Sequence, residues 1–212
     1  MERNRRIVDE PGPAGAERLI YFSDAVIAIA ITLLALELPV PGSDVHGNAA
    51  VLAFLRDHSA DYLAFLISFA AVAMHWLVHQ RLFRYVTGLV GRVIRFNLLW
   101  LLMIVLMPFT TKLMTSGADA FQAQFTIYAL DQALAGLFLV LAFGSLRKAG
   151  LLRPNTPPEV SADTTEFMTA VVVMFAVSIP VAFVTRWAEL CWLLLPVLRF
   201  GVRAVRGRAA VA

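Results

Sequence analysis

Of the 212 residues in the chain, 59% are apolar and only 16% are charged, whereas a soluble domain usually carries about 25% charged residues. The mean hydropathy of +0.74 is more than a globular core of this length can hide from water, so lipid must solvate part of the apolar surface. The net charge of +3 does not indicate nucleic acid as a partner, because the basic residues are scattered between apolar runs. The composition therefore excludes an ordinary soluble protein.

Six apolar segments approach the roughly 20 residues that a membrane-spanning helix requires. Helix is the expected form, because backbone groups in lipid must be hydrogen-bonded within their own segment. The sixth segment is short and closely follows the fifth, so these two can alternatively form one broken helix. The expected spans are Leu19–Leu38, Tyr62–Val78, Val93–Leu113, Phe121–Leu146, Phe167–Val184 and Trp187–Phe200.

These spans predict an all-α membrane protein that is embedded in the lipid bilayer. The six-helix transmembrane domain is expected over residues 19–200. A cytoplasmic N-terminal segment, residues 1–18, precedes it, and a basic cytoplasmic tail, residues 201–212, follows it.

Lysine and arginine residues fall mostly on one side of the expected spans. Fifteen lie in the two terminal segments, in the connection between the second and third spans, and in the connection between the fourth and fifth. The other three, on the opposite side, are Arg56, Lys112 and Arg186. Because cytoplasmic segments carry the excess of basic residues, we expect an even number of spans, both termini in the cytoplasm, and a location in the cell membrane.

Polar residues of the first three spans are expected at the same cytoplasmic depth. They are Ser23 and Asp24 in the first span, His75 and His79 in the second, and Asn97 in the third. An ionisable group inside a membrane is costly and usually has a partner, so we expect a hydrogen-bonded network that joins three helices. The alternative is that each side chain caps a helix or reaches the interface separately.

The two histidines are four residues apart and can therefore share one helix face. No HExxH motif or Cys/His cluster accompanies His75 and His79, so we predict neither a metal site nor a cofactor.

The first span carries no charge between Asp24 and Glu37. Its bulky aliphatic face is formed at helical spacing by Ile29, Leu33 and Leu36. A second stripe of small residues, which allow helices to pack closely in membranes, consists of Ala28, Thr32 and Ala35. From spacing alone, the aliphatic face can contact lipid or neighbouring helices as well as line a pore.

One segment of the first span resembles a known signature. The run Arg18-x-x-x-Phe22-Ser23-Asp24, continuing as an uncharged helix to Glu37, looks like the first helix of the transmembrane protein 175 family. That family comprises the endolysosomal potassium channel and its prokaryotic relatives. Further similarity to the family's second and third helices lies in His75-Trp76-x-x-His79, Asn97 and Pro108-Phe109-x-Thr111.

The resemblance implies a potassium-preferring cation channel, with potassium ions as the permeant species. Animal members carry two six-helix repeats and dimerise, so a chain with one repeat is expected to form a homotetramer. The first helix of each subunit would line the pore. No TVGYG-type sequence occurs, so selectivity by rings of backbone carbonyls has no support.

Residue roles carried over from the family place the constriction at Ile29, with further rings at Leu33 and Leu36. Thr32 matches a pore-proximal threonine that is discussed for selectivity. The residues that would hold the helix in place without touching ions are Arg18, Phe22, Ser23 and Asp24. Glu37 either raises the cation concentration near the outer mouth or is only an interfacial charge.

An intramembrane carboxylate, Asp131, lies near the middle of the fourth span beside Gln132. Such a group is a functional candidate, either as a structural partner for another helix or as a proton relay. The alternative function is therefore a small secondary transporter or proton pathway that uses Asp131, although the broken helices and repeats typical of transporters are not evident. An enzyme is disfavoured because GxSxG and SxxK motifs are absent.

Overall fold

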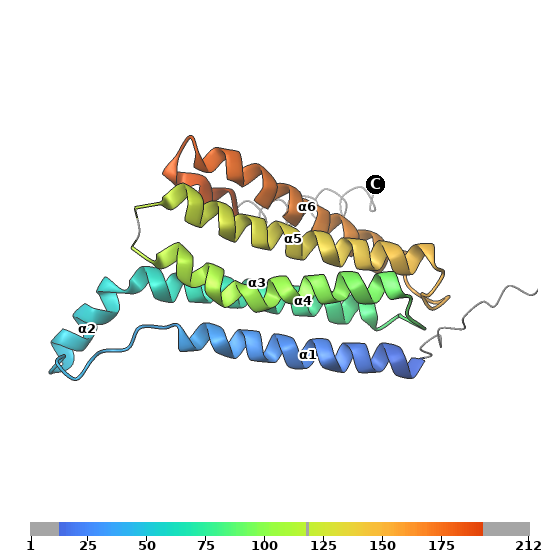
Figure 1. The fold of residues 1–212 in the computed structure, drawn as a ribbon, viewed down its shortest axis with the longest axis horizontal. Coiled ribbons are helices and arrows are strands. Elements are labelled where there is room, and N and C mark those ends of the chain that lie inside the picture. Colours follow the sequence, from blue (N-terminus) through green and yellow to red (C-terminus); the bar gives the residue numbers. More distant parts are fainter. Residues whose placement is uncertain (1–12, 118, 193–212) are drawn as a thin grey trace, which may run out of the picture.

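The computed structural model describes residues 13–117 and 119–192, and every regular element in this part of the chain is a helix. Five helices are long and apolar enough to cross a membrane, so the chain is a multi-pass membrane protein. They run back and forth as an antiparallel bundle (Figure 1). Their bounds are Pro13–Leu36 (α1), Ser59–Phe83 (α3), Gly91–Thr115 (α4), Phe121–Lys148 (α5) and Pro158–Ala182 (α6).

Each of the first five expected spans corresponds to one of these helices, although the ends differ: α1 and α6 begin earlier and end two residues sooner than expected. The largest difference is in α6, which begins at Pro158 and not at Phe167. Proline suits the first helical position, and the polar turns that follow it escape a search for apolar runs. The expected sixth span lies mostly outside the described residues, which show only its start, in the 3-10 turn η1 (Arg186–Glu189) and residues 190–192.

The centre of the bundle is formed by α4 and α5, which carry most of the buried residues (Figure 1). On one side α1 and α3 pack against α4, and on the other side α6 packs against α5. The approach of α6 depends on Gly136, because a β-carbon at this position would lie 2.8 Å from Cγ2 of Val172. A small residue is therefore needed where these two helices cross.

One end of the bundle carries most of the basic residues that the structure describes, and we call it the basic end. These residues are Arg18, Arg81, Arg84, Arg92, Arg95, Arg147, Lys148 and Arg153. The two loops at this end are joined by backbone hydrogen bonds, from Thr87 to the Leu151 carbonyl at 3.0 Å and from Arg153 to the Tyr85 carbonyl at 2.9 Å.

A glycine ends α5 at the basic end. Gly150 has a φ of 66°, and the amide of the next residue bonds back to the Leu146 carbonyl at 3.1 Å. This left-handed termination satisfies carbonyls that the helix end would otherwise leave unpaired, and it turns the chain toward α6.

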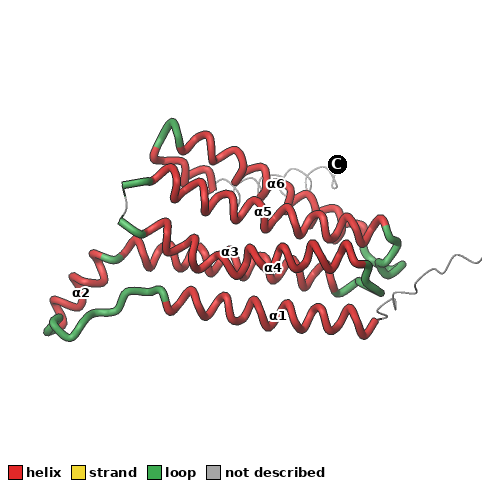
Figure 2. The backbone as a smooth tube through the Cα atoms, in the orientation of Figure 1, coloured by secondary structure: helices red, strands yellow, loops and turns green. Residues whose placement is uncertain are grey.

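At the opposite end, the segment between α1 and α3 extends beyond the bundle (Figure 2). It contains the short helix α2 (Asn48–Asp57), which has no buried residue. Two side chains attach the start of this segment to the bundle: the Tyr62 hydroxyl donates to the Pro39 carbonyl at 2.7 Å, and Lys112 Nζ donates to the Glu37 carbonyl at 3.3 Å.

Candidate functional site

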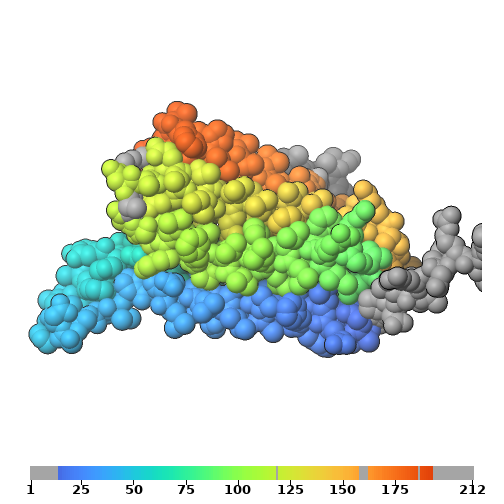
Figure 3. All heavy atoms as spheres, viewed as in Figure 1, coloured from blue at the N-terminus to red at the C-terminus, as the bar shows by residue number. Residues whose placement is uncertain are grey.

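The helix α1 has one buried face and one uncovered face. This helix packs against α3 and α4, and its buried residues are Ala16, Ser23, Ile27, Ala30 and Leu34. The aliphatic residues expected to form the constriction lie on the uncovered face, with exposed fractions of 60% for Ile29, 39% for Leu33 and 78% for Leu36. In the space-filling view α1 forms an edge of the molecule (Figure 3). This face can therefore contact another copy of the chain, contact lipid, or line a pore.

Thr32 belongs to the small-residue stripe, which is also on the uncovered side of α1. Its hydroxyl donates to the Ile29 carbonyl at 2.8 Å, so the oxygen still has acceptor capacity. Ile31, by contrast, is half-buried and packs against the core. The side chains of Ile29 and Ile31 therefore lie on different sides of α1.

A chain of hydrogen bonds joins α1, α4 and α3 near the basic end. The Ser23 hydroxyl donates to the Leu19 carbonyl at 2.8 Å and accepts from Asn97 Nδ2 at 3.0 Å. The Asn97 carbonyl oxygen in turn accepts from His79 Nε2 at 3.1 Å. Ser23, His79 and Asn97 have no exposed surface, so one amide side chain connects three helices in a dry interior.

Aromatic rings enclose the histidines of α3. The His79 ring stacks on Trp100, with centroids 4.6 Å apart and an interplanar angle of 7°, and on Phe83 at 4.0 Å. His75 accepts a hydrogen bond from Trp100 Nε1 at 3.3 Å. Both imidazoles are thus hydrogen-bonded to neighbouring side chains, and the described residues contain no group of three metal-binding side chains.

Asp24 makes no hydrogen bond to the described histidines or to Asn97, although the sequence placed it in the same network. Its carboxylate accepts from Trp76 Nε1 at 3.0 Å and from Gln80 Nε2 at 2.6 Å. Both partners come from α3, where they lie four residues apart and therefore share one helix face, and they were not identified from the sequence. Asp24 therefore makes a second, separate attachment between α1 and α3.

Two members of the signature run lie outside both hydrogen-bonded groups. Phe22 is 51% exposed, and Arg18 is exposed with no ion pair to the described residues. Phe22 belongs to the same uncovered side of α1 as Ile29.

Asp131 lies in α5 and is only 5% exposed. Neither of its carboxylate oxygens has a hydrogen-bond partner within the described residues, and the same holds for the amide of its neighbour Gln132. A buried polar group without a partner is costly, so this pair is either a functional position or one that needs water or a further partner. The geometry leaves both interpretations open.

The family profile described as endosomal/lysosomal potassium channel TMEM175 matches residues 18–108. A potassium channel of Chamaesiphon minutus is 34% identical over 136 residues, which are 64% of this chain and 65% of that protein. The crystal structure of a lysosomal potassium-selective channel TMEM175 homolog from Chamaesiphon minutus covers 90% of this chain and 98% of its own, with 27% identity and a TM-score of 0.71.

The chain is similar to TMEM175 channels over residues 18–108 and in its fold. The predicted resemblance is thereby confirmed, and the matched residues include the signature run of α1 and both histidines of α3. A chicken (Gallus gallus) protein named endosomal/lysosomal proton channel TMEM175 is 35% identical over 115 residues, which are 50% of this chain and 23% of that one. The alignments thus span less than two thirds of these TMEM175 relatives, whose names include both potassium and proton channels.

Proposed function

We propose that this chain is the subunit of a potassium-preferring cation channel that assembles as a homotetramer in the cell membrane. The basic end faces the cytoplasm, as the positive-inside rule requires, and we place both termini on the same side of the membrane because they too are rich in arginine. Four copies of α1 surround the pore. The observation that carries the proposal is the uncovered, uncharged face of α1 in a chain related to TMEM175 channels.

Stacked aliphatic rings would form the narrow part of this pore. Ile29, Leu33 and Leu36 are exposed in the single chain, although large aliphatic side chains on the other face of α1 are buried. A hydrated ion that crosses such a strip finds no ligand to replace its water, so conduction depends on ring width and on wetting. Thr32 adds a hydroxyl to this surface, where its oxygen can meet a passing cation.

Glu37, just beyond the end of α1, is exposed and would lie at the outer mouth of the pore. Its backbone carbonyl accepts the hydrogen bond from Lys112, which holds the end of the helix against α4. A ring of four carboxylates there would raise the local concentration of cations.

The hydrogen-bonded groups near the basic end would set the position of α1 without touching ions. Ser23 fixes the helix to Asn97 and, through it, to His79, while Asp24 fixes it to α3. Because all these contacts come from the face opposite to the constriction, they orient Ile29 toward the axis.

The test is ion flux through the purified protein in liposomes loaded with either potassium or sodium. Liposomes with the wild-type protein should release potassium faster than sodium. Ile29→Asn, which would place four polar groups on the axis, should raise the flux and reduce the discrimination. The matched change Ile31→Asn, on the half-buried side of α1, should do neither. Conduction that changes with position 31 and not with position 29 would contradict the assignment of the pore face.

The second candidate function, a transporter or proton pathway, depends on the unpartnered carboxylate of Asp131. It predicts that Asp131→Asn abolishes transport while Ile29→Asn has no effect. The channel proposal predicts the opposite pair of results.

A further inference from the structure

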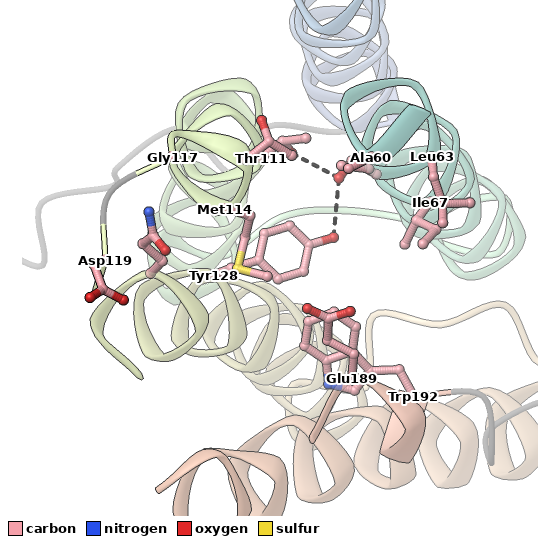
Figure 4. A pocket seen from close by; sticks show the side chains of 14 residues that line it. Ala60, Leu63, Ile67, Thr111, Met114, Gly117, Asp119, Tyr128, Glu189 and Trp192 are labelled. Atoms are coloured by element: carbon pink, nitrogen blue, oxygen red, sulfur yellow. Dashed lines mark hydrogen bonds between the residues drawn. The ribbon is translucent and has the colours of Figure 1, made fainter. Parts of the chain in front are cut away.

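A pocket of about 480 Å³ opens at the end of the bundle opposite the basic end, away from the exposed face of α1 (Figure 4). Its walls come from α3, α4, α5 and η1, together with Trp192 just after η1. The volume falls within the range of roughly 300–1,000 Å³ that is typical of small-molecule sites. The pocket therefore has the size of a ligand site.

The walls combine aliphatic and aromatic surface. Leu63 and Ile67 of α3 form one side, and the rings of Tyr128 and Trp192 form another, with centroids 5.3 Å apart (Figure 4). Trp192 is held in place by a hydrogen bond from its Nε1 to Ser178 at 3.2 Å and by stacking on Phe125 at 5.0 Å. These rings are fixed surfaces that a ligand can contact without first ordering them.

Polar groups on the floor are already paired with one another. The Ser68 hydroxyl forms hydrogen bonds with Tyr128 at 3.2 Å and with Thr111 at 2.7 Å (Figure 4). The floor therefore does not require a ligand that has many hydrogen-bonding groups.

The acidic residues that line the pocket are Glu189 and Asp119. Glu189 and Trp192 both line the pocket (Figure 4), and the Glu189 carboxylate makes no hydrogen bond or ion pair within the described residues. No lysine or arginine lines the pocket in the described part of the chain. A pocket that combines a carboxylate with aromatic faces, and has no cation among its described lining residues, can attract an organic ammonium ion.

We propose that this pocket binds a hydrophobic organic ammonium ion, with its charged nitrogen between Glu189 and the ring of Trp192 and its apolar part against Leu63 and Ile67. A neutral apolar ligand would bury the carboxylate without compensation, which is costly. An inorganic cation would leave the aromatic and aliphatic walls without a partner. This site is separate from the α1 face, so the proposal does not rest on ion conduction.

The test is isothermal titration calorimetry of the purified full chain in a maltoside detergent, which carries no ammonium group. The probe is phenyltrimethylammonium, and the uncharged comparator of similar size is 2-phenylpropan-2-ol. The protein should bind the ammonium probe and bind the alcohol at least tenfold more weakly. Equal binding of the two would overturn the proposal, because it would show an apolar cavity that ignores charge.

Two pairs of variants locate the site. Glu189→Gln should weaken binding of the ammonium probe about tenfold, whereas Asp57→Asn, which removes an exposed carboxylate outside the pocket, should leave it unchanged. Ala64→Phe should fill the pocket and abolish binding, whereas Ala70→Phe, at an exposed position of the same helix, should retain it.

Binding that survives both Glu189→Gln and Ala64→Phe would place the probe elsewhere and overturn the proposal. Should Ala64→Phe fail to fold, Glu189→Gln against Asp57→Asn decides alone. Competition by diheptanoylphosphatidylcholine would identify a lipid headgroup as the source of the ammonium ligand. Its failure to compete would identify a soluble amine.

Discussion

Replacing Asn97 by leucine tests how the interior near the basic end is held together. The substitution keeps the approximate volume of the side chain but removes its hydrogen bonds to Ser23 at 3.0 Å and to His79 at 3.1 Å. Ser23 keeps its bond to the Leu19 carbonyl, whereas His79, whose Nδ1 already has no partner, would lose its remaining one. An unsatisfied buried group costs about 1–3 kcal/mol, so we expect a loss of about 2 kcal/mol in the free energy of unfolding.

For a chain of this size such a loss corresponds to a fall in Tm of about 4–8 °C. The assay is thermal unfolding of the detergent-solubilised protein, followed by the size-exclusion profile after heating. Leu98→Ala, at an exposed position of the same helix, is the control and should melt close to the wild type.

A double variant makes the reasoning refutable. Combining Asn97→Leu with His79→Phe removes both polar partners, and two apolar groups of suitable shape should recover much of the lost stability. Two results would show that the hydrogen-bonded chain does not hold these helices. One is an Asn97→Leu variant that melts like the wild type, and the other is a double variant that loses more stability than the two single variants lose together.

Three further predictions concern the Asp24 carboxylate, the membrane topology and the assembly of the subunits. Asp24→Ala should leave the donors of Trp76 and Gln80 without an acceptor and lower the yield of assembled protein without altering ion preference; wild-type yield with changed selectivity would place Asp24 in the pore. A reporter that is active only in the cytoplasm should give signal when fused to Ala212, and signal from a periplasm-only reporter at that site would refute the even number of spans. Native mass spectrometry in mild detergent should show a tetramer, and a monomer that still conducts would contradict the proposed assembly.

The sequence was sufficient to predict five of the long helices and to place Ile29, Leu33 and Leu36 on one face of α1. Lipid leaves an apolar run no form but helix, and a period of 3.6 residues then sets which side chains share a face. This is why Ile29, Leu33 and Leu36 could be placed together before the fold was known, and why they lie on the side of α1 that its own chain does not cover.

The partners of polar side chains could not be predicted in the same way. Depth in the membrane correctly brought Ser23, Asn97 and His79 to one level, but it does not determine the rotation of each helix about its axis. Asp24 is only one residue from Ser23, and one residue turns the helix by about 100°, so it meets Trp76 and Gln80 instead. The pocket near Glu189 was also missed, since its walls come from four separate segments with no common motif.

The most direct test of the central proposal is the accessibility of position 29 in a conducting protein. In a background that lacks the free cysteine (Cys191→Ser), Ile29→Cys and Ile31→Cys are recorded in planar bilayers while a positively charged methanethiosulfonate reagent is applied. If α1 lines the pore, the reagent should reduce the current of Ile29→Cys irreversibly and leave that of Ile31→Cys unchanged. A current through Ile29→Cys that the reagent does not alter, together with block at position 31, would contradict the account.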